Sequence, residues 1–214
     1  MSRDWHAWHR QYDDPTSSLS RRLQVVRDQL TAVLTEHPEV RRLVSLCAGD
    51  GRDVLPVLAT VAPSVEAVLV ELDPHLAVAA EEMAAALGLP AVVVRNDDAG
   101  NTESLRGAVP ADLVMACGVF GNVTDEHVRR TVNTLPMLLS DQGFVVWTRG
   151  AKVPGDPTLA AGDPSESVRR AFAGTGFDEV AFVRPDDASF RVGVHRLARP
   201  AEAFVPDVQM FRFL

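Results

Sequence analysis

Cysteine is scarce in this chain, and its placement argues against cysteine-based sites. The 214 residues include two cysteines, Cys47 and Cys117, each in or just after an apolar run. Isolated cysteines in such runs are usually reduced, buried thiols rather than members of a disulfide framework, and neither has the spacing of a metal ligand. We therefore expect neither a disulfide-stabilised fold nor a thiolate-bound metal.

The sequence also lacks long hydrophobic runs and an excess of basic residues. No stretch reaches the roughly 18 uninterrupted apolar residues that cross a membrane, and the N-terminus has no apolar signal-peptide core. The 29 acidic residues outnumber the 21 basic ones, and the net charge of −8 repels phosphate backbones. We expect a cytoplasmic protein with one hydrophobic core and no membrane or nucleic-acid partner.

Apolar runs of strand length alternate with helical patterns along the chain. Helices are expected at residues 19–34, 53–60, 75–87, 124–139 (bent at Pro136) and 165–173, and strands at 43–46, 65–72, 91–94, 111–116, 144–148, 179–184 and 190–197. This alternation predicts βαβ units with right-handed crossovers and a mostly parallel sheet. Only five residues, 185–189, join the last two strands, which predicts an antiparallel hairpin at one edge.

A glycine turn follows the first expected strand. Gly49 and Gly51 flank Asp50 where the apolar run passes into helical sequence. Such a turn brings backbone N–H groups close to an anionic or polar ligand without a Cβ in the way, although two glycines can also form a plain tight turn. A dinucleotide fold has a third glycine where Val54 stands, so a dinucleotide is disfavoured.

These features together resemble the class I S-adenosylmethionine-dependent methyltransferases, over residues 40–197. The resemblance implies an α/β, Rossmann-like, seven-stranded, mostly parallel sheet with helices on both faces and a C-terminal antiparallel hairpin. It implies a single domain over residues 1–214, with an N-terminal helical lid (1–38), a core (39–198) and a C-terminal tail (199–214). The implied cofactor is S-adenosylmethionine, and the product is S-adenosylhomocysteine.

The resemblance also implies which residues hold the cofactor. Glu71 ends the second strand 20 residues after Gly51, where a carboxylate accepts hydrogen bonds from both ribose hydroxyls. Asp98 and Ala99 resemble the pair that meets adenine, with Asp97 as the alternative acid. The other expected cofactor contacts are Ala48, Gly49 and Gly51 around the methionine part, Arg22 at its carboxylate, and Tyr12, Leu72 and Cys117.

Four departures from the family pattern limit the chemistry. Ser45 stands where family members usually carry an acid, so loop carbonyls are expected to hold the cofactor's amino group; Cys47 stands where they carry a glycine. No Asn-Pro-Pro-Tyr segment follows Cys117, which disfavours adenine and glutamine amides as acceptors. Cys117 also replaces the acid of the magnesium-dependent branch, so we expect no catalytic metal.

Aromatic and histidine residues are concentrated before the first helix. Residues 5–12 hold two of the three tryptophans, two of the six histidines and the single tyrosine. An N-terminal segment commonly covers the cofactor in this fold, which makes His9, Tyr12 and His6 candidates for proton removal from the acceptor. Alternatively, the aromatic side chains only pin this segment to the core. The expected substrate-pocket residues are Trp8, Phe120 and Asn122.

The leading functional hypothesis is methyl transfer to an oxygen, nitrogen or carbon atom of a small organic molecule, without a metal. Modest length, acidic charge and no appended recognition domain favour such an acceptor. Two alternatives are a nicotinamide-dependent oxidoreductase, which shares the strand, loop and acid pattern, and a non-catalytic S-adenosylmethionine-binding regulatory subunit.

Overall fold

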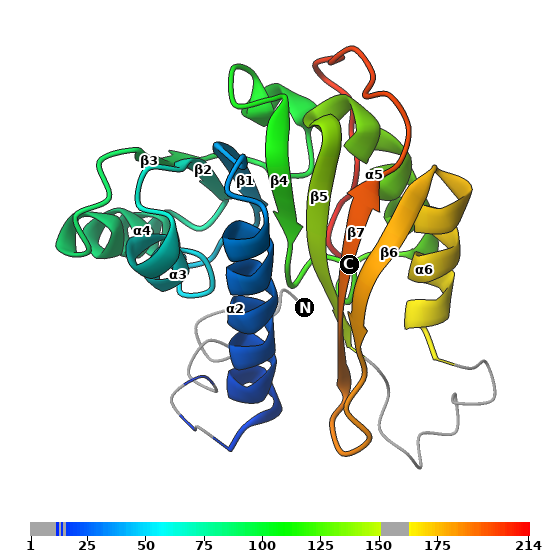
Figure 1. Ribbon diagram of the computed structural model, residues 1–214, viewed down its shortest axis with the longest axis horizontal. Coiled ribbons are helices and arrows are strands. Elements are labelled where there is room, and N and C mark those ends of the chain that lie inside the picture. The colour runs from blue at the N-terminus through cyan, green and yellow to red at the C-terminus, as the bar shows by residue number, and fades with distance from the viewer. Residues whose placement is uncertain (1–11, 13, 15, 151–162) are drawn as a thin grey trace.

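The computed structural model describes residues 12, 14, 16–150 and 163–214, and its centre is a seven-stranded sheet (Figure 1). The strand order is β3-β2-β1-β4-β5-β7-β6. All neighbouring pairs are parallel except those of β7 with β5 and β6. The strands are β1 (Arg42–Leu46), β2 (Glu66–Glu71), β3 (Val92–Asn96), β4 (Ala111–Ala116), β5 (Leu139–Gly150), β6 (Phe177–Val183) and β7 (Phe190–Leu197). The predicted fold, with its closing antiparallel pair, is confirmed.

Helices cover both faces of the sheet, because alternate strand residues enter two different hydrophobic clusters. Leu43 belongs to the cluster beneath α2 and α3, whereas Val44 belongs to the cluster beneath α5 and α6. The helices are α2 (Ser18–Glu36), α3 (Leu55–Val61), α4 (Pro74–Ala86), α5 (Asp125–Leu138) and α6 (Ser165–Gly174), with a 3-10 turn η2 (Thr102–Leu105). None of the helices in the described ranges has the length and apolar character needed to cross a bilayer.

The sheet reverses direction between β1 and β4. From β1 the chain builds outward to β2 and β3, and then returns to place β4 on the other side of β1. Ser45 pairs with Leu69 of β2 on one side and with Met115 of β4 on the other. In open parallel sheets, ligands bind outside the carboxyl ends of the strands at such a reversal. The topology therefore points to the loops that follow β1, β2 and β4.

One strand departs clearly from its predicted bounds. β5 begins at Leu139, directly after α5, and includes the turn that we expected to precede it. Leu139 pairs with Ala111 before a register shift brings Phe144 opposite Leu113. This pairing extends the strand beyond the apolar residues 144–148 that signal it in the sequence. The other predicted helices and strands lie within two residues of their observed bounds.

The C-terminal tail folds back over the carboxyl end of the sheet. The Met210 N–H donates to the Gly100 carbonyl at 2.7 Å, and the Leu214 N–H donates to the Asn122 carbonyl at 3.1 Å. Met210 is fully buried, and a Cβ on Gly100 would lie 2.5 Å from the Phe211 carbonyl oxygen. Close packing without a side chain at Gly100 therefore lets the tail reach the loops after β3 and β4.

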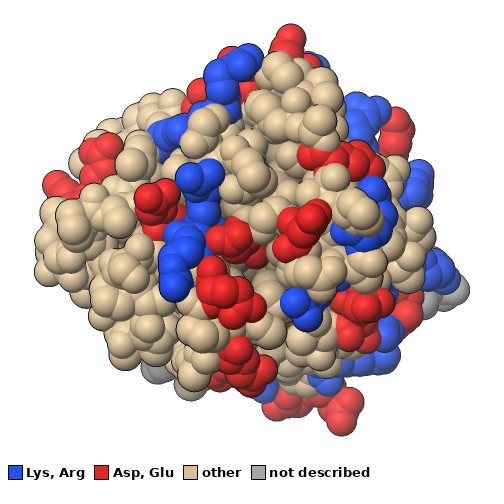
Figure 2. All heavy atoms as spheres, turned by 45° about the horizontal axis from the view of Figure 1, so that its top comes forward, with Lys and Arg blue, Asp and Glu red and all other residues tan. Residues whose placement is uncertain are grey.

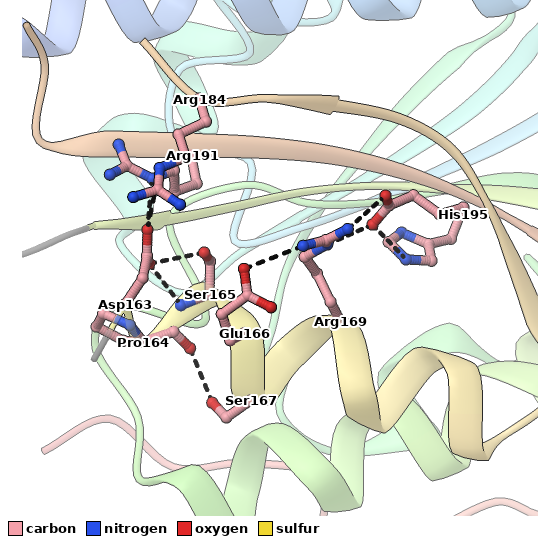
Figure 3. Close-up of polar contacts among 10 residues, drawn as sticks. Asp163, Pro164, Ser165, Glu166, Ser167, Arg169, Arg184, Arg191 and His195 are labelled. Carbon is pink, nitrogen blue, oxygen red and sulfur yellow. Dashed lines mark hydrogen bonds and ion pairs between the residues drawn. The ribbon is translucent and has the colours of Figure 1, made fainter. Parts of the chain in front are cut away.

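Ion pairs fasten α6 to the β6–β7 hairpin (Figure 3). Arg169 of α6 donates from Nε and Nη2 to the two carboxylate oxygens of Glu179, at 2.6 and 2.8 Å.

A buried hydrogen bond joins β5 to β7. The Trp147 Nε1–H donates to Nδ1 of His195 at 3.0 Å. Burial lowers the pKa of His195 to about 4, so the ring is neutral at neutral pH and serves as a buried acceptor.

Candidate functional site

A cavity of about 310 Å³ opens at the place that the topology indicates. Its walls come from the loops after β1 and β2, the end of β4, the first turns of α2, and Tyr12 and Phe213 near the two chain ends. The apolar part of the lining is made by Leu23, Val26, Leu72, Leu76 and Phe213. Cavities of this size accept a nucleoside-sized ligand.

The glycine turn gives the cavity a backbone wall. Cys47, Gly49 and Gly51 all adopt positive φ angles, of 54°, 58° and 74°. A Cβ on Gly51 would lie 2.6 Å from Leu55 Cδ1, so this glycine lets the loop pack directly against α3. The positive φ of Cys47 explains why a glycine would suit this position. Gly51 therefore shapes the turn from behind, whereas Ala48 and Gly49 line the cavity.

Glu71 is held at the carboxyl end of β2 by backbone donors. Its Oε2 accepts from the Gly49 N–H at 2.7 Å, and its Oε1 accepts from the Asp73 N–H at 2.9 Å. Each carboxylate oxygen has a second acceptor site, so both can still receive a ligand donor. The carboxylate is thus fixed against the glycine turn, in position to meet a pair of hydroxyl groups.

A cluster of charged side chains around Tyr12 also lines the cavity. Arg22 donates from Nη2 to the Tyr12 hydroxyl at 2.8 Å, and the Arg52 guanidinium lies 4.6 Å from the centre of the Tyr12 ring. The Arg52 Nε donates to both oxygens of Asp50 at 2.9 Å. Burial raises the pKa of Tyr12 and outweighs the opposing effect of Arg22, so Tyr12 is a neutral phenol at neutral pH.

Asp53 is the least satisfied acid in this cavity. Its Oδ1 is buried and has no hydrogen-bond partner among the described residues. Burial raises the pKa of Asp53 to about 6, against the opposing effects of its own backbone N–H and of Arg22. Asp53 was not among the predicted site residues, although an acid two positions after Gly51 was a signal that could have been used.

The two cysteines line the cavity as protonated thiols. Cys47 directly follows β1 and Cys117 directly follows the neighbouring β4. Burial is the main cause that raises both pKa values well above the ordinary one, and nearby carboxylates act in the same direction. These thiols are therefore poor nucleophiles, and they contribute shape rather than covalent chemistry.

The structure brings most of the predicted cofactor residues together. Tyr12, Arg22, Ala48, Gly49, Glu71, Leu72 and Cys117 all line the cavity. Asp98 and Ala99 lie outside its lining: the Asp98 Oδ1 accepts from the Gly100 N–H at 2.8 Å, and Ala99 is buried in the core. Asp97 is engaged through its Oδ1 by the Asp98 N–H at 2.7 Å. The assignment of the adenine contact stays a prediction.

Two predicted substrate-pocket residues do not line this cavity. Phe120 is fully buried, and its ring packs against Trp147 and Phe172 in the core beneath α5 and α6. Asn122 donates from Nδ2 to the Gly118 carbonyl at 2.6 Å, which braces the loop after β4. Phe213 of the tail lines the cavity instead, and no periodic pattern in the sequence indicated its path. His6, Trp8 and His9 lie outside the described residues.

Sequence comparison assigns the chain to a family. A family model described as "Putative methyltransferase" matches residues 19–161, more than half of the chain. The chain belongs to this methyltransferase family. The matched range includes α2, the glycine turn, Glu71 and Cys117, and the predicted resemblance to class I methyltransferases is confirmed. No curated protein sequence matches the chain.

Solved methyltransferase structures share the fold. The CurJ carbon methyltransferase superposes with a TM-score of 0.67 and 16% identity, over 92% of this chain and 59% of CurJ. The N-methyltransferase NodS from Bradyrhizobium japonicum gives a TM-score of 0.60 and 15% identity, over 88% of this chain and 99% of NodS. The N,N-8-amino-8-demethyl-D-riboflavin dimethyltransferase RosA from Streptomyces davawensis gives a TM-score of 0.57 and 22% identity, over 91% of this chain and 59% of RosA. At these identities the likeness shows the fold alone.

Proposed function

We propose that this methyltransferase uses S-adenosylmethionine to methylate an oxygen, nitrogen or carbon atom of a small organic molecule. The observation that carries the proposal is the position of the Glu71 carboxylate, which two backbone N–H groups fix beside the glycine turn. A vicinal diol such as ribose presents two donors to two oriented acceptors. The described residues around the cavity thus fit a ligand that combines a nucleoside with a charged group.

The residues of the chain bind and orient the reactants. When bound, S-adenosylmethionine supplies a sulfonium methyl group, and transfer from it needs alignment more than further activation. Leu23 and Val26 of α2, together with Phe213, supply apolar walls that exclude water from the cavity. Tyr12 is a neutral phenol beside Arg22, so it suits orienting an acceptor by hydrogen bonding.

The small acceptor is supported by the distribution of charge. The chain carries a net charge of −8, and the face shown in Figure 2 intersperses basic with acidic side chains. A polyanionic acceptor would meet no continuous basic surface on that face. The proposed enzyme transfers the methyl group without a metal and acts in the cytoplasm. Its partner is the small-molecule acceptor.

The test is a calorimetric titration of the protein with S-adenosylhomocysteine and, separately, with NAD. We expect binding of S-adenosylhomocysteine only, and we expect Glu71→Ala to weaken it about 100-fold, because two charge-assisted hydrogen bonds are lost. Glu66→Ala at the exposed start of the same strand is the matched control and should bind as wild type does.

Methyl transfer is then measured with methyl-labelled S-adenosylmethionine and a panel of small phenols, amines and carbon acids. Turnover of a panel member supports the proposal. Binding of NAD without binding of S-adenosylhomocysteine would contradict it and favour an oxidoreductase. Tight binding of S-adenosylhomocysteine without turnover of any acceptor would contradict the enzymatic part and favour a regulatory subunit.

A further inference from the structure

The acids that line the cavity differ in how their oxygens are used. Both oxygens of Glu71 accept backbone N–H groups, and those of Asp50 accept from Arg52. The Oδ1 of Asp73 caps α4 by accepting from the His75 N–H at 2.9 Å. Asp53 Oδ1 is buried without a hydrogen-bond partner in the described part of the chain. A buried carboxylate oxygen without a donor is unfavourable, and a bound cation would relieve it.

The position of Asp53 also matches a gap in the family pattern. Family members usually carry an acid at the position of Ser45, but here that position holds a serine that is 1% exposed within β1. Ser45 does not line the cavity, whereas Asp53 lines it from the far end of the same loop. In this chain the acid that reaches the cavity therefore stands near the end of the loop after β1, and not within β1 itself.

We propose that Asp53 binds the α-ammonium group of the amino-acid part of S-adenosylmethionine, in place of the missing strand acid. This inference rests on the proposed function. The ammonium group would donate to Oδ1 and supply the charge that the buried carboxylate lacks. Arg22 lines the same cavity and acts electrostatically on Asp53. It would meet the carboxylate of that amino acid, so the two ionic groups of the ligand would face opposite charges.

The sequence alone led us to expect that backbone carbonyls of the loop hold the amino group. Carbonyl oxygens would provide only partial negative charge, whereas Asp53 provides a full negative charge at a desolvated position. It also makes ligand affinity depend on the ionisation of one side chain. The charged and titratable groups that face Asp53 are Arg22, Arg27, Asp50, Tyr12 and Cys117.

The experiment compares three ligands in calorimetric titrations of the intact protein and its Asp53→Asn variant. The ligands are S-adenosylhomocysteine, its analogue without the α-amino group, and methylthioadenosine, which lacks the amino-acid part. We expect wild type to prefer S-adenosylhomocysteine over the desamino analogue by about 10- to 100-fold. In Asp53→Asn this preference should fall to about twofold or less, while methylthioadenosine binds equally well to both proteins.

Asp28→Asn is the matched control. It makes the same substitution at an exposed acid of α2 outside the cavity lining, whose Oδ1 accepts from the neutral Gln24 Nε2 at 2.8 Å. We expect this variant to retain the wild-type preference for the α-amino group.

The possible outcomes separate the two proposals. If Asp53→Asn binds methylthioadenosine normally and still prefers S-adenosylhomocysteine as wild type does, the role of Asp53 is wrong and the proposed function stands. If wild type binds none of the three ligands, the proposed function itself fails. Unchanged binding of methylthioadenosine also shows that the variant is folded.

Discussion

Asp163 and Asp53 are both acids that are largely withdrawn from solvent, but their carboxylates are satisfied in opposite ways. Asp163 lies before α6, where its Oδ1 accepts from the Ser165 N–H and hydroxyl at 2.9 and 2.7 Å (Figure 3). Its Oδ2 accepts from the Arg191 Nε at 2.8 Å. Asp53 lies in the cavity, and its Oδ1 has no such donor among the described residues.

The pKa values follow this difference. Burial tends to raise the pKa of Asp163, but hydrogen bonds from Ser165 and Arg191 outweigh it and lower the pKa below the ordinary value. For Asp53, burial dominates and the pKa is about 6. A buried charge stabilises a fold only when donors replace the lost water. The comparison thus separates an acid that stabilises the apo fold from one that weakens it and that we assign to ligand binding.

The largest expected effect on stability comes from breaking the ion pair between Asp163 and Arg191. Asp163→Asn removes the counter-charge of Arg191, whose side chain is 10% exposed, and should lower the free energy of unfolding by about 3 kcal/mol. Urea denaturation at neutral pH measures this. Asp187→Asn, which removes the exposed partner of Arg21 on the hairpin loop, is the control and should unfold at the wild-type denaturant concentration. A wild-type unfolding curve for Asp163→Asn would show that the pair does not stabilise the fold.

The second prediction is that removing the charge of Asp53 raises the free energy of unfolding, whereas removing that of Asp163 lowers it. Asp53→Asn should raise the free energy of unfolding of the ligand-free protein by about 2 kcal/mol at pH 8, since a raised pKa marks an ionised form that folding disfavours. The amide keeps a polar atom at the site, so part of the burial cost remains. Urea denaturation of the variant and wild type at pH 4 and pH 8 measures the effect.

The pH dependence of that difference follows from the direction of the shift. The folded-state pKa of Asp53, about 6, lies above its ordinary value of 3.8, so the native protein binds this proton more tightly than the unfolded chain does. Its contribution to stability is complete below about pH 4 and is lost as the pH rises through 6. The gain from Asp53→Asn should therefore be small at pH 4 and largest at pH 8. A variant less stable than wild type at pH 8 would mean that Oδ1 has a stabilising partner.

Local signals in the sequence predicted the framework of the site well. Strand-length apolar runs, Gly49 and Gly51, and the acid at Glu71 placed the cavity at the correct loops. Phe213 was missed because the return of the tail brings it to the cavity from a distant part of the sequence. Asp53 carried a local signal, its place two positions after Gly51, but the burial of its Oδ1 without a donor depends on the packing of α2 over the loop. Phe120 shows the converse limit, because an apolar residue after a strand can face either a cavity or the core.

The smallest expected effect tests which of its donors stabilises the Asp163 carboxylate. Ser165→Ala removes one neutral hydroxyl donor from Asp163 but leaves the Ser165 backbone N–H and Arg191 in place. One hydrogen bond of this kind contributes about 1 kcal/mol, so the variant should lose about that much in urea denaturation. Ser167→Ala is the control and should lose less, because its hydroxyl donates to the neutral Pro164 carbonyl and not to a carboxylate. If Ser165→Ala destabilises as much as Asp163→Asn, the hydroxyl rather than the arginine satisfies this acid, and the contrast with Asp53 would rest on a single neutral donor rather than on charge pairing.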